Sequence, residues 1–417
     1  MNVCKLSVIA LAVAAGSVQP VFADSQADAT GFLEGAKLNV KARNMYMNRD
    51  NRATNATKAY GEEWAQGFIG NFESGFTQGT VGFGLDAIGL YGMKLDTGRG
   101  RFGGGTGLLQ PTKDGQYVKD DYGYAGAAVK MRISQTVLKF GDQVVNNPVF
   151  ATSDSRLLPE TAQGLLVTSN EIDKLTLQGG HFTALRSRNQ SSHDNAGLDV
   201  INFGGGSYKF NKNLSTSAYY SNVEDVWRKY YGSLTYGLAL SPQDVVKFDL
   251  NAYDTKSIGK EELGEYDNTI WSLTASYTLG AHTFQVGRQV VNGTRGYDYG
   301  IDGNSTIFLG NSVQYSDFNH EDEKSWQARY DLNMATYGVP GLTFMTRYVK
   351  GTDFKTATSD DAKAWERDVE VKYVFQSGPA KDLSLRVRAA SYRSPSSDGA
   401  GKVDDTRLII EYPISIL

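Results

Sequence analysis

Basic side chains at every second position, between apolar ones, are the residues of this chain whose types and spacing best suit chemistry. The pattern occurs at 40–43 (VKAR), 129–133 (VKMRI) and 385–389 (LRVRA). Successive side chains of a β-strand point to opposite faces, so each stretch presents cations on one face and hydrocarbon on the other. Arginine and lysine attract anions, and the planar guanidinium holds a carboxylate through two hydrogen bonds. The pattern therefore indicates strand faces that attract carboxylates.

Residue types that support catalysis or metal binding do not combine into a recognisable site. The four histidines are scattered without metal-ligand spacing, and no GxSxG-like element accompanies His181. The glycine runs at 103–105 and 204–206 lack the strand–loop–helix context of a nucleotide site. We therefore expect a protein that is not an enzyme, with no catalytic residue, metal, cofactor or nucleic-acid partner.

The first residues indicate export. A basic residue precedes an apolar run at 6–15, and 21–23 (VFA) fits a small-x-Ala cleavage site. We predict a cleaved signal peptide at 1–23 and a single transmembrane β-barrel domain at 24–417. Cys4 is the only cysteine and leaves with the signal peptide, which excludes disulfides and thiolate metal sites.

Alternation typical of strands continues along most of the chain. At 271–279 (WSLTASYTL) apolar residues alternate with hydroxyl residues, and aromatic residues stand near both ends. A soluble extracellular all-β protein, such as a lectin or propeller, is the alternative on composition, but the polar face of its strands would be mostly lysine, glutamate and threonine. Mixed charges and small hydroxyls indicate a water-filled lumen instead, with the apolar face against lipid.

The turns indicate an antiparallel barrel in an outer membrane. Short turn signals such as 211–213 and 279–281 alternate with long polar segments such as 292–322, and outer-membrane barrels have short turns on one rim and long loops on the other. At roughly 20 to 22 residues per strand and connection, the chain forms about 18 strands. The last strand, 408–416, would close against the first.

We therefore predict an all-β, transmembrane antiparallel β-barrel of about 18 strands in the outer membrane of a Gram-negative bacterium. Its expected partners include outer-membrane lipid, lipopolysaccharide and the barrel assembly machinery.

Landmarks along the whole chain carry a family resemblance. The segment 138–143 (LKFGDQ), followed by 153–161 (SDSRLLPET), resembles the third-loop region of the OprD-type (Occ) substrate-specific outer-membrane porins of pseudomonads. Further matches are 43–50, 341–348 (GLTFMTRY) and the terminal 411–413 (EYP). The Ser-Arg-Leu-Leu-Pro element is the most specific of these.

The resemblance implies a barrel whose inward-folded loops narrow the pore to an eyelet, with a ladder of arginines and lysines on its wall that guides carboxylates. It implies that Arg156 lies at or beside the eyelet and that Asp302 supplies an opposing acid. The implied wall positions are Arg43, Lys130, Arg132, Arg347, Lys372, Arg386, Arg388 and Arg407. A monomer or a weak trimer is also implied.

The predicted function is passive, substrate-preferring uptake of small carboxylate-containing molecules, either cyclic or aromatic carboxylates or amino acids. The family that the chain resembles includes one branch that favours basic amino acids and another that favours cyclic or aromatic carboxylates. The residues of the loop 144–149 (VVNNPV) favour the branch for cyclic or aromatic carboxylates. An unselective general diffusion porin is the alternative. A structural or adhesive barrel without conductance ranks below both.

Overall fold

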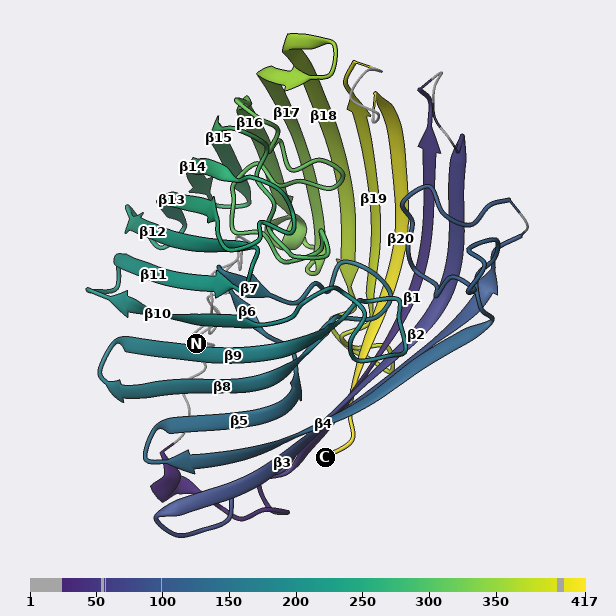
Figure 1. Cartoon of the computed structure of the whole chain (residues 1–417). Helices are drawn as coiled ribbons and strands as arrows, with labels where there is room; N and C mark the ends of the chain where they lie inside the picture. The colour runs from purple at the N-terminus through teal and green to yellow at the C-terminus, as the bar shows by residue number, and fades with distance from the viewer. Residues whose placement is uncertain (1–24, 54–55, 57, 99, 396–400) are drawn as a thin grey trace.

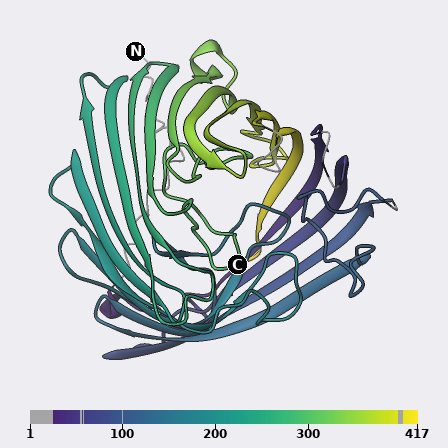
Figure 2. The same ribbon diagram turned by 45° about the horizontal axis from the view of Figure 1, so that its top comes forward.

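A closed barrel makes up most of the computed structural model, which describes residues 25–53, 56, 58–98, 100–395 and 401–417. The predicted leader at 1–23 lies outside these residues. In the described part of the chain, 18 antiparallel strands form one sheet that surrounds several loop segments (Figure 1, Figure 2). The predicted all-β class and the strand number are confirmed.

Each strand pairs with its neighbours along the chain, and β20 closes the barrel against β1. The barrel strands are β1 (Lys37–Asn51), β2 (Tyr60–Glu73), β3 (Val81–Asp96), β4 (Asp121–Ile133), β5 (Thr136–Gln143), β8 (Thr161–Ile172), β9 (Leu175–Arg186), β10 (Ile201–Lys209), β11 (Leu214–Val223), β12 (Trp227–Ala239), β13 (Asp244–Ser257), β14 (Asp267–Leu279), β15 (His282–Gly293), β16 (Lys324–Asn333), β17 (Leu342–Thr356), β18 (Ser359–Val374), β19 (Ser384–Arg393) and β20 (Lys402–Ser415). Outside the barrel sheet are the ribbon β6 (Asn146–Asn147) and β7 (Phe150–Ala151) and the 3-10 turns η1 (Gln26–Asp28) and η2 (Met334–Tyr337).

The apolar residues of the strands cover the outside of the barrel. In β14, Leu273 and Tyr277 are exposed, whereas Ser272 and Thr274 are buried against the interior. The alternation thus acts as predicted, with hydrocarbon outside and polar groups inside. Among the described residues, none of the helices has the length and apolar character needed to cross a membrane.

The two rims of the barrel differ in their connections. One rim, the short-turn rim, has tight turns such as 134–135 and 280–281. The other, the long-loop rim, has long segments, and several of them turn into the barrel (Figure 2). The segment 144–160 between β5 and β8 carries the β6–β7 ribbon and is called the inward loop below.

Buried carboxylates on the inner wall hold the long loops in place. Glu63 of β2 accepts hydrogen bonds from two consecutive backbone N–H groups of the loop after β3, at 2.8 and 2.9 Å. Glu366 of β18 does the same for the loop after β15, at 2.8 Å each. Both carboxylates are fully buried, so they bind loop backbone rather than solutes in the lumen.

Candidate functional site

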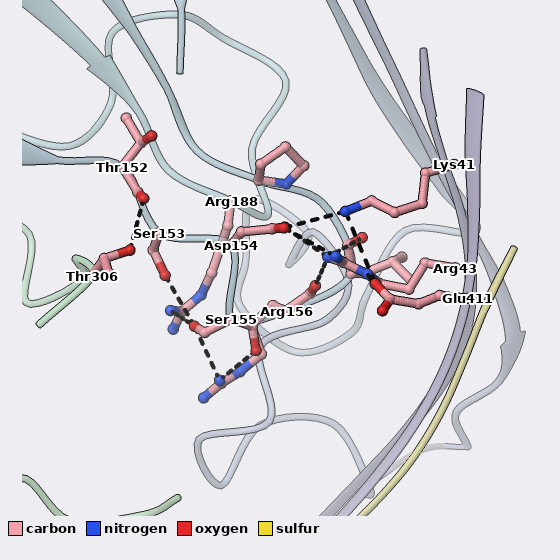
Figure 3. Close-up of polar contacts among 12 residues, drawn as sticks. Lys41, Arg43, Thr152, Ser153, Asp154, Ser155, Arg156, Arg188, Thr306 and Glu411 are labelled. Carbon is pink, nitrogen blue, oxygen red and sulfur yellow. Dashed lines mark hydrogen bonds and ion pairs between the residues drawn. The ribbon is translucent and has the colours of Figure 1, made fainter. Parts of the chain in front are cut away.

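The inward loop is tied to the wall by Arg43 of β1 (Figure 3). The guanidinium donates to Asp154 and to Glu411 of β20, each at 2.7 Å. It also donates to the carbonyl oxygen of Arg156 at 2.6 Å, and Lys41 lies 3.4 Å from Asp154. Burial alone would raise the pKa of Asp154, but the hydrogen bonds and charges of Arg43 and Lys41 lower it below its usual value. Arg43 therefore fixes the loop position.

Two arginines meet at one hydroxyl beside this tether. Arg156, on the inward loop, and Arg188, on the loop after β9, place Nη1 atoms 3.4 and 3.1 Å from the Oγ of Ser155 (Figure 3). Arg156 also donates to the carbonyl oxygen of Thr106 at 2.7 Å. Neither arginine forms an ion pair with a carboxylate of the described residues. The two are called the paired arginines below.

The charges of the paired arginines are poorly compensated. Burial, followed by the charges of Arg407 and Arg188, lowers the pKa of Arg156 well below its usual value. Burial also lowers the pKa of Arg188, although the charges of Glu160 and Asp302 partly offset it. Because a guanidinium stays protonated under ordinary conditions, this position attracts an anion.

Two carboxyl groups lie beside Arg188. Glu160, at the end of the inward loop, is fully buried and accepts a hydrogen bond from the Ser153 N–H at 2.7 Å. Its other oxygen has no donor among the described residues. Burial and the charge of Asp302 raise the pKa of Glu160 to about 8. Asp302 accepts from the Ser187 hydroxyl at 3.2 Å, so the structure places it against the loop after β9, while its role as the opposing acid stays a prediction.

Basic residues on the inner wall of β17–β20 lie in successive rows, in which residues of neighbouring strands are side by side. Arg388 of β19 is paired with Arg407 of β20, and the next inward row toward the short-turn rim pairs Arg386 with Lys372. Successive inward positions are about 7 Å apart along a strand. The predicted ladder positions of these four strands therefore lie together.

Most of the ladder cations already have an acidic partner. The pairs are Arg347–Asp368 (2.5 Å), Arg407–Asp405 (2.6 Å), Arg386–Glu370 (2.8 Å) and Arg388–Glu370 (3.0 Å). Asp368 and Asp405 are almost completely buried, which confines these charges to the wall. Lys372 differs, because it has no carboxylate partner within the part of the chain that the structure describes.

Lys130 and Arg132 are on the inner face of β4, as the alternation of side chains along the strand predicts, but they lie at the short-turn end of this strand. Lys130 forms an ion pair with Asp86 at 2.6 Å, and Arg132 donates to Gln26 at 2.9 Å. Both cations lie over the ring of Phe76. The structure therefore does not bring them to the paired arginines, and Arg132 instead helps to hold the amino-terminal segment.

A cavity of about 590 Å³ occupies the lumen between the inward-folded loops and the short-turn rim. Its lining includes Pro148 of the inward loop, Lys174 of a short turn, and Arg329 and Arg347 of the wall. The inward-folded loops thus border, on this side, a polar chamber that contains wall cations.

Sequence reasoning missed Arg188 and Arg49. Arg49 forms an ion pair with Asp405 at 2.9 Å, next to the ladder. The signal was present in both cases, because Arg186 and Arg188 repeat the alternating basic pattern, and Arg49 has the strand parity of Arg43. Among the described residues, no group of three or more histidine, cysteine, aspartate or glutamate side chains is placed to hold a metal ion.

Known proteins resemble this chain over almost its full length. Residues 30–416 match the model of the outer membrane porins of the OprD family. Porin D of Pseudomonas aeruginosa is 47% identical, with 100% of both chains covered.

Solved structures agree with this match. The structure of P. aeruginosa OccK9 (OpdG) has a TM-score of 0.87 and 39% identity, covering 93% of this chain and 100% of that one. The structure of P. aeruginosa OpdK with vanillate has a TM-score of 0.84 and 37% identity, covering 92% and 100%.

Proposed function

The chain belongs to the OprD family of outer membrane porins, and we propose that it is a passive, substrate-preferring channel for small carboxylate-bearing molecules. As a member of this family it is an outer-membrane channel of a Gram-negative bacterium and not an enzyme. The long-loop rim then faces the cell exterior and the short-turn rim faces the periplasm.

The single observation that carries the proposal is the meeting of Arg156 and Arg188 at Ser155 without a carboxylate partner among the described residues. Two guanidinium groups in hydrogen-bond reach of one hydroxyl can share one carboxylate, through charge-assisted and bidentate bonds. Because the site lies among narrowing loops, the low-dielectric surroundings strengthen this attraction.

Release requires weaker contacts beyond the constriction. Arg386 and Arg388 share Glu370, so each offers a carboxylate only part of its charge. Several weak sites in sequence let an anion move on, whereas one tight site would block the pore. The basic residues of the wall therefore pass the carboxylate on toward the periplasm.

An unselective general diffusion porin is the alternative. It would need a wide opening, whereas here the inward loop is fixed to both β1 and β20 through Arg43. A fixed loop favours a preference for particular solutes, and the conductance of single channels distinguishes the two functions.

Two classes of carboxylate compete as the substrate. The predicted preference for cyclic or aromatic carboxylates has support from OpdK, whose structure was solved with vanillate. Amino acids have support from Asp302 beside Arg188, because an acid next to the carboxylate site can hold an ammonium or guanidinium group. The predicted lipopolysaccharide contacts, assembly machinery and monomer or weak trimer stay predictions.

Uptake into liposomes and single-channel recording test the proposal. The panel comprises benzoate, vanillate, arginine, lysine and an uncharged sugar of similar size. We expect a small conductance that carboxylates interrupt, and faster uptake of at least one carboxylate class than of the sugar. A large conductance that no solute interrupts, with equal uptake of all solutes, would refute the proposal.

A further inference from the structure

The outer wall near the long-loop rim carries a row in which cations alternate with aromatic residues. Strand register sets Arg288 beside Trp326, Trp326 beside Lys350, Lys350 beside Trp365, and Trp365 beside Arg393. This row crosses β15–β19 without interruption. Trp326 is 60% exposed and Lys350 is also exposed, so the row faces out of the barrel.

Rings and cations in this row contact one another. The guanidinium of Arg288 lies 4.6 Å from the ring centroid of Trp326, and that of Arg393 lies 5.8 Å from the centroid of Trp365. Tyr348 stacks on Trp365 at 5.9 Å. Arg367, exposed, is the register partner of Tyr348. The outer girdle is defined as Arg288, Trp326, Tyr348, Lys350, Trp365, Arg367 and Arg393.

The outer girdle lies at one edge of the apolar band. Along β18, Trp365 and Tyr373 are eight residues apart, and the outward residues between them include Val369 and Val371. Eight residues of strand span about 26 Å, or roughly 20 Å across a membrane at the usual tilt, which approaches the height of an outer-membrane apolar band. The girdle is therefore at the level of the head groups of the outer leaflet.

Several of its cations are uncompensated. Arg288, Lys350 and Arg367 form no ion pair with a carboxylate of the described chain. Arg393 is different, because it pairs with Asp404 at 2.9 Å. At an outward position of this kind, cations attract anionic head groups.

The neighbouring sector of the same rim, beyond β20, differs in charge. The outer ends of β1–β4 carry Asp50, Glu62 and Asp121. Tyr91 donates to Asp121 at 3.1 Å, which leaves that carboxylate at the surface. Asp50 is paired with Arg52 at 2.9 Å and Glu62 with Arg101 at 3.5 Å, so ion pairs balance charge there, whereas unpaired cations face outward at β15–β19.

We propose that the outer girdle is a binding site for a phosphorylated glycolipid of the outer leaflet. Lys350, Arg367 and Arg288 bind its phosphate groups, while Trp326 and Trp365 pack against its sugar rings and upper acyl chains. Aromatic residues with long basic side chains at this level also anchor barrels without a specific ligand. Three uncompensated cations, Arg288, Lys350 and Arg367, gather here on the neighbouring strands β15–β18 beside two tryptophans, and this clustering is what distinguishes a phosphate site from such an anchor.

The test uses the full-length folded barrel in detergent, titrated with diphosphorylated lipid A. The variant is Lys350→Gln with Arg367→Gln, and the matched control is Lys212→Gln with Lys381→Gln, which removes the same charge from exposed positions at the short-turn rim. We expect the first variant to bind lipid A about tenfold or more weakly and the control to bind as the wild type does. Equal binding by the first variant and the wild type would overturn the proposal.

Two measurements on the wild type keep the test independent of variant folding. Lipid A stripped of both phosphates should bind about tenfold or more weakly, and excess inorganic phosphate should displace little of the intact lipid. Equal affinity for the stripped lipid would show a nonspecific anchor and refute the site. Full displacement by inorganic phosphate would show that the glycolipid is not the ligand.

Discussion

The cations of the wall and the cations of the loops differ in what surrounds them. Arg347, Arg386 and Arg388 each lie within 3.0 Å of a wall carboxylate, whereas Arg156 and Arg188 share only a hydroxyl and backbone oxygens. Partner charges weaken the field that a passing anion meets at the wall. Selection of the substrate therefore belongs to the loops and its transfer to the wall.

Removing the paired arginines should have the largest effect. Arg156→Gln with Arg188→Gln should lower the uptake rate of the preferred carboxylate about tenfold or more, since each charge-assisted hydrogen bond contributes roughly 1.5 to 3 kcal/mol. The matched control, Arg386→Gln with Arg388→Gln, removes the same charge from the wall. Liposome uptake should then fall by less than about threefold. An equal loss of uptake rate in both double variants would contradict the claim that the loop arginines select the substrate and the wall arginines only transfer it.

Releasing the inward loop should have the next largest effect. Arg43→Gln removes the tether and leaves Asp154 and Glu411 without their main partner, so the loop moves more freely. Single-channel recordings should show higher conductance with more frequent steps, and carboxylate preference should fall about fivefold. Lys41→Gln is the control, because Lys41 is more exposed and lies farther from Asp154. If the recordings of Arg43→Gln matched those of the wild type, Arg43 would not be what holds the inward loop in place.

Wall positions with and without an acidic partner should respond differently. Lys372→Gln should slow carboxylate uptake about twofold to threefold and leave stability unchanged, because no buried partner is abandoned. Arg347→Gln leaves the buried Asp368 unpaired and should destabilise the barrel by about 3 to 5 kcal/mol. Thermal unfolding in detergent measures the second effect. Equal stability of the two variants would contradict the assignment of partners.

The smallest expected effect is that of pH. Glu160 has a pKa raised to about 8, so it is neutral below that value and gains a negative charge above it. Between about pH 6 and about pH 10, anion preference should fall about twofold as Arg188 acquires a charged neighbour. Reversal potentials in salt gradients report this change. Glu160→Gln should remove it, and a pH response that persists in this variant would assign it to another group.

The fold follows from the sequence more completely than the site does. Alternation at 271–279 encodes which side chains face lipid, and it correctly indicated the barrel class. The strand number followed correctly from the chain length at roughly 20 to 22 residues per strand and connection. Parity also placed Lys130 and Arg132 inside, but parity encodes the face of a strand and not the height along it. Their position at the short-turn rim therefore lay beyond what the pattern can predict.

Loop geometry explains the other differences. Arg188 and Ser155 are 33 residues apart along the chain, on two different loops, and no periodicity encodes such a contact. The loop anchors Glu63 and Glu366 likewise have the parity of lumen residues, yet they are buried by backbone from distant loops. Strand patterns specify the frame, whereas the path of each loop depends on tertiary contacts.

The paired-arginine site is tested most directly by a crystal structure of the protein with a brominated carboxylate that liposome assays show it takes up. Anomalous diffraction then locates the bromine. The predicted result is a carboxylate bound between Arg156 and Arg188, with the bromine directed into the lumen. A carboxylate bound instead at Arg386 and Arg388, with the paired arginines unoccupied, would contradict selection by the loops.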